Sequence, residues 1–295
     1  MSLLIKNPFR RLVVVLILTM IVFAVQFIGG VATNSLSLLA NAGHFLGDIG
    51  SATLALVAAR LEKQRPTQAH SYGYGRSGTV AAFINALMLG AIGVSMIVTG
   101  LLRLFHPVAV TTGPILIIGL IGLAFNLLST LILHQGDHSD LNLRAMFAHA
   151  ASDAAASLAI VVAAWLIERT GWTGWDPLTA ALIGLAIGHM AWRVARPSLR
   201  VLMEATPEGL DPETIRQTIL TDPAVDEVHH LHVWSLGPRY HALSAHVRLR
   251  DMSIREGQSV IDTVETILAE QYHIHHVTIQ IETDQHPQSD PYCHI

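Results

Sequence analysis

The first two-thirds of the chain contains six apolar runs of about 20 residues, the length that a helix needs to cross a bilayer. They lie near residues 12–32, 36–59, 79–102, 113–133, 145–167 and 177–195. Backbone polar groups inside a bilayer must be satisfied within the chain, so such runs favour helices. Charged residues make up only 14% of the chain, whereas a soluble protein has about 25%. We therefore predict a bundle of six transmembrane helices, with the lipid bilayer as one partner.

Lysine and arginine residues collect on one side of these predicted helices. If the N-terminus is cytoplasmic, the opposite loops contain only Arg103 and Arg169. The cytoplasmic segments then contain Lys6, Arg10, Arg11, Arg60, Lys63, Arg65, Arg76, Arg144, Arg193, Arg196 and Arg200. Basic residues mark the cytoplasmic side of membrane proteins, so both termini are predicted to be cytoplasmic. The short loops and termini favour a bacterial inner, or plasma, membrane.

The composition changes after the sixth run, and a second domain is predicted there. Asp211-Pro212-Glu213 has the pattern of a helix start, with an N-cap, a first-turn proline and an acidic residue. The periodicity then predicts strands at 225–236 and 240–250, a helix at 255–272 and a strand at 275–282. This α-β-β-α-β order predicts a small α+β domain of the ferredoxin-like, metallochaperone-like kind. We expect a transmembrane domain at 1–204 and a cytoplasmic domain with a C-terminal tail at 205–295.

The motif His-x-x-x-Asp occurs twice, each time inside an apolar run. The copies are His44 with Asp48 and His149 with Asp153. A spacing of four residues puts both side chains of a pair on one helix face. A carboxylate at the bilayer centre costs roughly 3 kcal/mol, so ionisable residues at this depth indicate function. Together the two faces offer two imidazole nitrogens and two carboxylate oxygens, a set suited to tetrahedral zinc.

This predicted ligand set also suits the exchange of zinc for protons. Two aspartates neutralise a bound Zn²⁺, which lowers the cost of holding it in a low dielectric. Zinc binding requires ionised aspartate and neutral histidine, and an unperturbed histidine titrates near pH 6.5. Protons and Zn²⁺ therefore compete for the same four groups. We expect an alternating-access antiporter that exports zinc from the cytoplasm.

Other functions are less well supported by the residues. The net charge of -4 gives no reason to expect a nucleic-acid partner. An enzyme is not expected, since His-Glu-x-x-His does not occur and four protein ligands leave no position for catalytic water. A transporter of cadmium, cobalt, nickel or iron remains an alternative. So does a membrane-anchored zinc sensor, although a sensor gives the buried carboxylates no purpose.

Several motifs along nearly the whole chain resemble the cation diffusion facilitator family of metal/proton antiporters. They are NSLSLLANAGHFLGD, SYGYGR, AAFINAL, LNLRAMFAHAASDAAAS, HHLHVWSLGPRYHALSAHV and HHVTIQIE. The similarity is greatest to the zinc-transporting bacterial branch, which resembles vesicular zinc transporters. It implies that His44, Asp48, His149 and Asp153 form the transport site. Histidine rather than aspartate at position 44 favours zinc over cadmium.

Three asparagines lie inside the apolar runs. Asn85 and Asn126 are predicted to make interhelical hydrogen bonds. Many relatives have aspartate where this chain has Asn41, one turn before His44. That departure leaves the four predicted ligands intact and bears on proton coupling instead.

The resemblance also directs attention to two loops in which relatives bind metal. In the loop between the second and third runs only His70 matches, because Thr67 and Tyr74 occupy the other ligand positions. We predict no complete site there. The loop between the fourth and fifth runs contains His134 and His138 in the segment HQGDHSD, where relatives are often histidine-rich. These histidines are candidates for weak metal entry, or simply parts of a solvated polar loop.

For the C-terminal domain the resemblance implies a homodimer and a regulatory zinc site. The positions that match are His229, His246, His275 and Glu282. Gln280 stands where some relatives have a histidine, so one variant of that site is not expected. Cys293, the only cysteine, is a candidate soft ligand. Zn²⁺ would thus be both the transported substrate and a regulatory ion.

Overall fold

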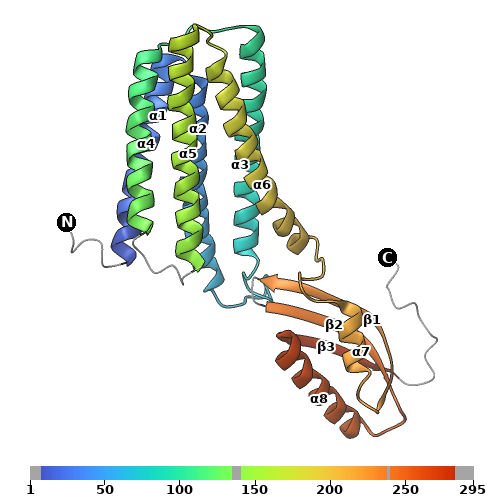
Figure 1. Ribbon diagram of the computed structural model, residues 1–295. Helices are drawn as coiled ribbons and strands as arrows, with labels where there is room; N and C mark the ends of the chain where they lie inside the picture. The colour runs from blue at the N-terminus through green and yellow to red at the C-terminus, as the bar shows by residue number, and fades with distance from the viewer. Residues whose placement is uncertain (1–7, 135–140, 238–239, 283–295) are drawn as a thin grey trace. The chain divides into compact units, whose positions relative to one another are not determined.

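The computed structural model describes residues 8–134, 141–237 and 240–282, and its N-terminal part contains six long helices (Figure 1). They are α1 (Pro8–Thr33), α2 (Leu36–Glu62), α3 (Ser77–Phe105), α4 (Thr112–His134), α5 (Leu141–Thr170) and α6 (Trp175–Leu202). All six contain a stretch that is long and apolar enough to span a membrane. Each apolar run predicted from the sequence falls within one of them, so the six-helix prediction is confirmed.

The chain divides into two compact units. The first comprises residues 1–53 and 84–193, and the second comprises residues 54–83 and 194–295. The end of α2, the start of α3 and the end of α6 thus fall in the same unit as the C-terminal domain. The boundary expected between residues 204 and 205 remains a prediction.

The first unit is a helical bundle in which α4 packs against both α1 and α5. Its buried core includes Leu38, Ile115, Ile160, Ala180 and Ile187. Many large apolar side chains face outward instead, which is the arrangement that a lipid environment stabilises. Helices α3 and α6 approach closely at Gly93 and Gly184, where a methyl group on Gly93 would lie 2.7 Å from the carbonyl oxygen of Gly184. Small residues allow this close packing.

The first turn of α2 is held by a carboxylate from another helix. Asp176, in the first turn of α6, is only 1% exposed. Its Oδ2 accepts a hydrogen bond of 2.6 Å from the Leu36 amide, and its Oδ1 accepts bonds from the amide and hydroxyl of Ser37 and the hydroxyl of Ser35. The first amides of a helix have no partner within the helix, and a negative charge there is favourable. Asp176 therefore joins α6 to the start of α2.

The C-terminal domain has the predicted α-β-β-α-β order. Its elements are α7 (Pro212–Ile219), β1 (Val225–Gly237), β2 (Tyr240–Leu249), α8 (Ile254–Tyr272) and β3 (Ile274–Glu282). Asp211 caps α7 as predicted, since its side chain accepts a hydrogen bond from the Thr214 amide. Helix α8 begins with a capping box made by Ser253 and Glu256. This capping box was not predicted from the sequence.

The three strands form one sheet in the order β1-β2-β3, with β1 and β2 antiparallel and β2 and β3 parallel. Residues of both helices and all three strands share one apolar core, which includes Ile215, Val228, Leu243, Leu268 and Ile274. The connection between β1 and β2 lies outside the described residues, although Gly237 at the end of β1 pairs with Tyr240 at the start of β2. Pairing of the strands in this sheet positions the histidines of the domain, as His229 and His246 show.

Replacing Asp176 with alanine is expected to destabilise the bundle. The first amides of α2 would lose a buried charged acceptor, and bonds of this kind contribute roughly 1.5–3 kcal/mol each. Allowing for partial relaxation, we expect a loss of about 3 kcal/mol and a fall in the thermal unfolding midpoint of roughly 5–10 °C in detergent. Asp262→Ala, which removes an exposed carboxylate of α8, is the matched control. Equal midpoints for the two variants would contradict the capping role of Asp176.

Candidate metal centre

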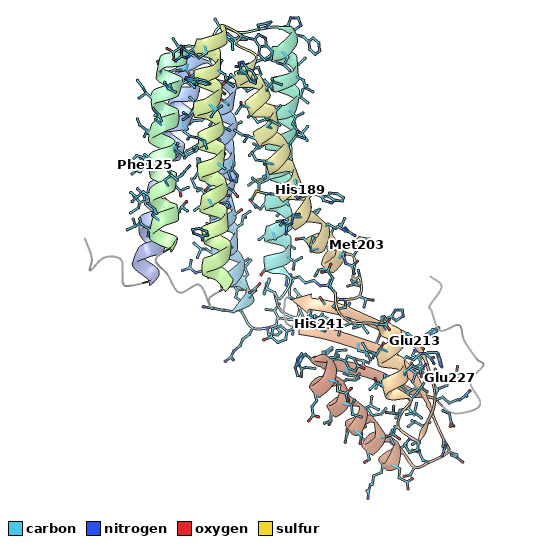
Figure 2. All side chains as sticks on the ribbon, viewed as in Figure 1. Phe125, His189, Met203, Glu213, Glu227 and His241 are labelled. Atoms are coloured by element: carbon cyan, nitrogen blue, oxygen red, sulfur yellow. The ribbon has the colours of Figure 1, made fainter. Side chains whose placement is uncertain are left out.

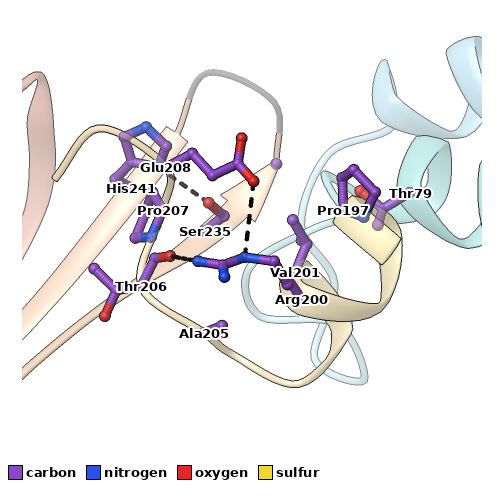
Figure 3. A pocket seen from close by; sticks show the side chains of 11 residues that line it. Thr79, Pro197, Arg200, Val201, Ala205, Thr206, Pro207, Glu208, Ser235 and His241 are labelled. Atoms are coloured by element: carbon purple, nitrogen blue, oxygen red, sulfur yellow. Dashed lines mark hydrogen bonds and ion pairs between the residues drawn. The ribbon is translucent and has the colours of Figure 1, made fainter. Parts of the chain in front are cut away.

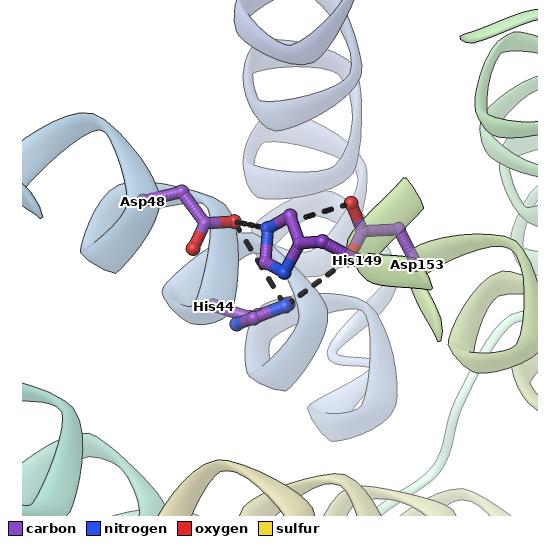
Figure 4. A group of neighbouring side chains, drawn as sticks. All are labelled: His44, Asp48, His149 and Asp153. Atoms are coloured by element: carbon purple, nitrogen blue, oxygen red, sulfur yellow. Dashed lines mark hydrogen bonds and ion pairs between the residues drawn. The ribbon is translucent and has the colours of Figure 1, made fainter. Parts of the chain in front are cut away.

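Helices α2 and α5 bring the two His-x-x-x-Asp pairs together (Figure 4). His44 Nε2 lies 3.1 Å from Asp153 Oδ1, and His149 Nε2 lies 3.2 Å from Asp48 Oδ2. The distances within each helix are longer, at 3.8 Å for His44 to Asp48 and 3.9 Å for His149 to Asp153. Each histidine is therefore closest to the aspartate of the other helix. This crossed pairing links the two helices at the level of the ligands.

The spacing of these four groups approaches that of a tetrahedral ligand shell. Ligands about 2.0–2.1 Å from a zinc ion stand about 3.3–3.4 Å apart at the corners of a tetrahedron. The nitrogen–oxygen separations are 3.1–3.9 Å, with the two distances to Asp153 made to different oxygens, and one ligand atom from each residue lies within 4.8 Å of all the others. Small movements of the side chains would therefore let all four bind one ion.

The four side chains differ in exposure along the helices. The side chain of His149 is 39% exposed and that of Asp48 is 23% exposed, whereas those of Asp153 and His44 are 10% and 8% exposed. His149 is nearer than Asp153 to the start of α5, and Asp48 is nearer than His44 to the end of α2. By the predicted orientation, the two more exposed groups are those nearer the cytoplasm.

A second group of potential ligands crosses the sheet of the C-terminal domain. His229 on β1 pairs with His246 on β2, and Glu282 ends β3 beside them. Glu282 Oε2 lies 3.1 Å from His229 Nε2, and Glu282 Oε1 lies 2.8 Å from His246 Nδ1. His229 and Glu282 are buried. Two imidazoles and a carboxylate therefore converge on one point, and they are three of the residues expected for this domain.

Further charged side chains support this second group. Glu227 Oε1 lies 3.8 Å from the Nδ1 of His229, on the side of the ring away from Glu282. Arg248 Nη1 lies 2.9 Å from Glu227 Oε2. Glu227, which Figure 2 labels, thus stands between a potential ligand and a cation. At 3.8 Å Glu227 makes no hydrogen bond to His229 Nδ1, so its contribution to this group is one of charge.

The other predicted site residues do not join either group. His275 is an exposed residue near the start of β3, seven residues and so roughly 23 Å along the strand from Glu282. His70 is exposed in a loop, where its ring stacks on that of Tyr74 at 4.6 Å. His138 and Cys293 lie outside the described residues, as does the side chain of His134. Within the described ranges, His70 belongs to no group of three or more potential ligands.

Two residues near these groups were not singled out from the sequence. His230 has a positive φ of 49° at an irregularity of β1, and its ring lies 5.4 Å from that of His229 and 4.9 Å from that of His246. Gln26, in the C-terminal half of α1, is fully buried and accepts a hydrogen bond from Asn41. The sequence does carry a signal for Gln26, since it is a glutamine inside an apolar run. For His230 no sequence pattern indicates a strand irregularity.

A cavity of about 290 Å³ lies within the second unit but offers weaker chemistry (Figure 3). Its lining includes Arg200, which lies 4.0 Å from Glu208 and donates a hydrogen bond to the Thr206 carbonyl. Ser235 Oγ and His241 Nδ1, from two other residues that line the cavity, contact each other at 3.2 Å. Burial lowers the pKa of the His241 imidazole, and the nearby charge of His273 lowers it further. The polar groups named here are occupied by one another, so we assign no ligand to this cavity.

Comparison with known proteins identifies the family. Residues 12–203 match the cation efflux transmembrane domain, and residues 207–284 match the cytoplasmic domain of cation efflux proteins. The chain belongs to the cation efflux family. It is a multi-pass bacterial membrane protein of the cation diffusion facilitator type, in the zinc-transporting bacterial branch, and the family is one of transporters rather than enzymes.

Named relatives match almost the full length. The chain is 34% identical to the zinc transporter ZitB of Escherichia coli strain K12, over 98% of this chain and 91% of ZitB. It is 36% identical to the cadmium, cobalt and zinc/H⁺-K⁺ antiporter of Bacillus subtilis strain 168, over 89% of this chain and 85% of the relative. It is 32% identical to the metal cation efflux system protein CzcD of Cupriavidus metallidurans, over 97% and 90%.

The two ligand groups should be separable by metal titration of the full-length protein. Asp153→Ala is expected to remove binding by the helical group and to leave one class of zinc site per chain. Adding Glu282→Gln should weaken the remaining site by at least about tenfold, because the carboxylate that joins His229 to His246 loses its charge. Glu265→Gln, on an exposed face of α8, is the control. Retained binding in the Asp153→Ala, Glu282→Gln protein would contradict the assignment of the C-terminal group.

Proposed function

We propose that the protein exports Zn²⁺ from the cytoplasm in exchange for protons, through a site made by His44, Asp48, His149 and Asp153. The observation that supports this most strongly is the crossed approach of the two pairs at 3.1 Å and 3.2 Å. Two nitrogens and two oxygens at tetrahedral spacing suit zinc, whereas magnesium and calcium prefer more oxygen ligands. With both aspartates ionised, the zinc-loaded site is formally neutral.

The names of the relatives support zinc and widen the choice of metal. ZitB is named a zinc transporter, and the Bacillus relative is named for cadmium and cobalt as well as zinc. Cobalt takes the same nitrogen and oxygen ligands, so it is the second candidate substrate. The Bacillus relative is also named as an antiporter. We carry proton exchange over to this chain because ionised aspartate and neutral histidine are needed for metal binding.

The mechanism that we propose is alternating access. The greater exposure of His149 and Asp48 supports metal entry from the cytoplasmic ends of α2 and α5 in this conformation. The bundle then reorients, so that protons from the other side reach the ligands and displace the metal. The protonated site returns to the cytoplasmic side. This scheme assumes cytoplasmic termini in a bacterial inner membrane, as the distribution of basic residues predicts.

For the C-terminal domain we propose homodimer formation and zinc-dependent regulation. His229, His246 and Glu282 supply three ligands, which leaves a fourth position for another ligand or water. A site with an exchangeable position suits a sensor of cytosolic zinc. The match of residues 207–284 to the cytoplasmic domain of cation efflux proteins supports a regulatory role for this domain, separate from transport by the helices.

Zinc flux into proteoliposomes under an imposed pH gradient tests the transport proposal. Asp153→Ala is expected to lower gradient-driven flux by more than about tenfold, since it removes one ligand and one negative charge. Glu168→Ala removes an exposed carboxylate from the outer end of the same helix and should keep the wild-type rate. Unchanged flux in Asp153→Ala would contradict the proposal. Wild-type protein that binds zinc but moves none would favour the membrane-anchored sensor instead.

A further inference from the structure

Four buried neutral polar side chains form a layer one turn from the His-Asp group. They are Gln26 on α1, Asn41 on α2, Asn126 on α4 and Ser157 on α5, and none is more than 4% exposed. Asn41 precedes His44 by three residues and Ser157 follows Asp153 by four. The layer therefore lies toward the start of α2 and the end of α5, on the side away from the more exposed ligands. We call these four residues the amide layer.

Hydrogen bonds connect the amide layer across four helices. Asn41 Nδ2 donates to Gln26 Oε1 at 2.7 Å and to Ser157 Oγ at 3.5 Å. Asn126 Nδ2 donates to the same Ser157 Oγ at 2.9 Å and to the main-chain oxygen of Asp153 at 3.1 Å. The predicted interhelical role of Asn126 is thereby confirmed. The network ends on the backbone of one of the proposed ligands.

We propose that the amide layer positions the two ligand-bearing turns and so sets the geometry of the metal site. The proposal rests on the transport site proposed above. The contact between Asn41 and Ser157 fixes the separation of α2 and α5 within one turn of His44 and Asp153. Asn126 positions the turn of α5 that contains Asp153, through its hydrogen bond to the main-chain oxygen of that residue. Outer partners of this kind commonly change metal affinity by 10–100-fold when they are removed.

The chemistry of the layer suits positioning rather than metal binding. All four groups are neutral, so they add no charge to a site that two aspartates already balance against a divalent ion. Gly122 on α4 is needed at its position, because a methyl group there would overlap the Nε2 of Gln26. Within the described chain, Gln26 Nε2 and Asn41 Oδ1 make no hydrogen bond to protein, which leaves one donor and one acceptor for a bridging water.

Cobalt binding tests this role in the full-length protein. His229→Ala and His246→Ala first remove the C-terminal group, so that any Co²⁺ spectrum comes from the helical site. In this parent, Ser157→Ala and Asn126→Leu should each weaken Co²⁺ binding about tenfold and alter its visible absorption bands, which report coordination geometry. Ser157→Thr restores a hydroxyl and should restore the spectrum. Thr33→Val is the control, since that buried hydroxyl donates to the Gly29 carbonyl of its own helix.

The outcomes separate this proposal from the proposed function. A changed spectrum and weaker binding in Ser157→Ala and Asn126→Leu, with a parent-like Thr33→Val protein, would support positioning. Gly122→Ala should act in the same direction, because its methyl group would overlap Gln26 Nε2 and would lie 3.5 Å from Ser157 Oγ. Parent-like spectra and affinities in Ser157→Ala, Asn126→Leu and Gly122→Ala would overturn the proposal. If the parent itself gave no Co²⁺ signal that Asp153→Ala removes, the transport site would fail first, and the positioning role with it.

Discussion

The cost of holding carboxylates inside apolar helices constrains the whole bundle. Asp48 and Asp153 are stable at that depth only with partners, and each finds its nearest partner on the other helix. The crossed contacts with His149 and His44 thus make α2 and α5 depend on each other. A divalent cation bound at the site proposed for transport would have to replace these contacts with its own charge between the two aspartates.

Two further buried polar systems act on the same helix, α2. Asp176 satisfies its first amides, and the amide layer contacts it one turn before His44. Both lie on one side of the ligands, toward the start of α2. The more exposed ligands, Asp48 and His149, lie on the other side. In this conformation polar contacts join the helices on one side of the four residues, and the side chains on the other side are more exposed, an asymmetry that fits the alternating access proposed above.

The same ligand types recur in the C-terminal domain in a different setting. On the helices, a spacing of four residues aligns the groups, whereas on the sheet they are aligned by the pairing of His229 with His246 and by the last residue of β3. Among the described residues, three donors converge there instead of four. A closed four-ligand set suits a cargo that must be enclosed, and a three-ligand set suits an ion that exchanges with the surrounding solution.

The sequence by itself determined the six helices, the order of the C-terminal elements and the four residues of the helical group, because apolar length and periodicity are local properties. Spacing could pair His44 with Asp48, but only the tertiary structure decided that each histidine lies closer to the opposite aspartate. It also decided that His229, His246 and Glu282 meet while His275 does not, since strand register fixes which ends coincide. The partners of Gln26, Asn41 and Asp176 came from the structure alone, because they lie on different helices and depend on how those helices pack.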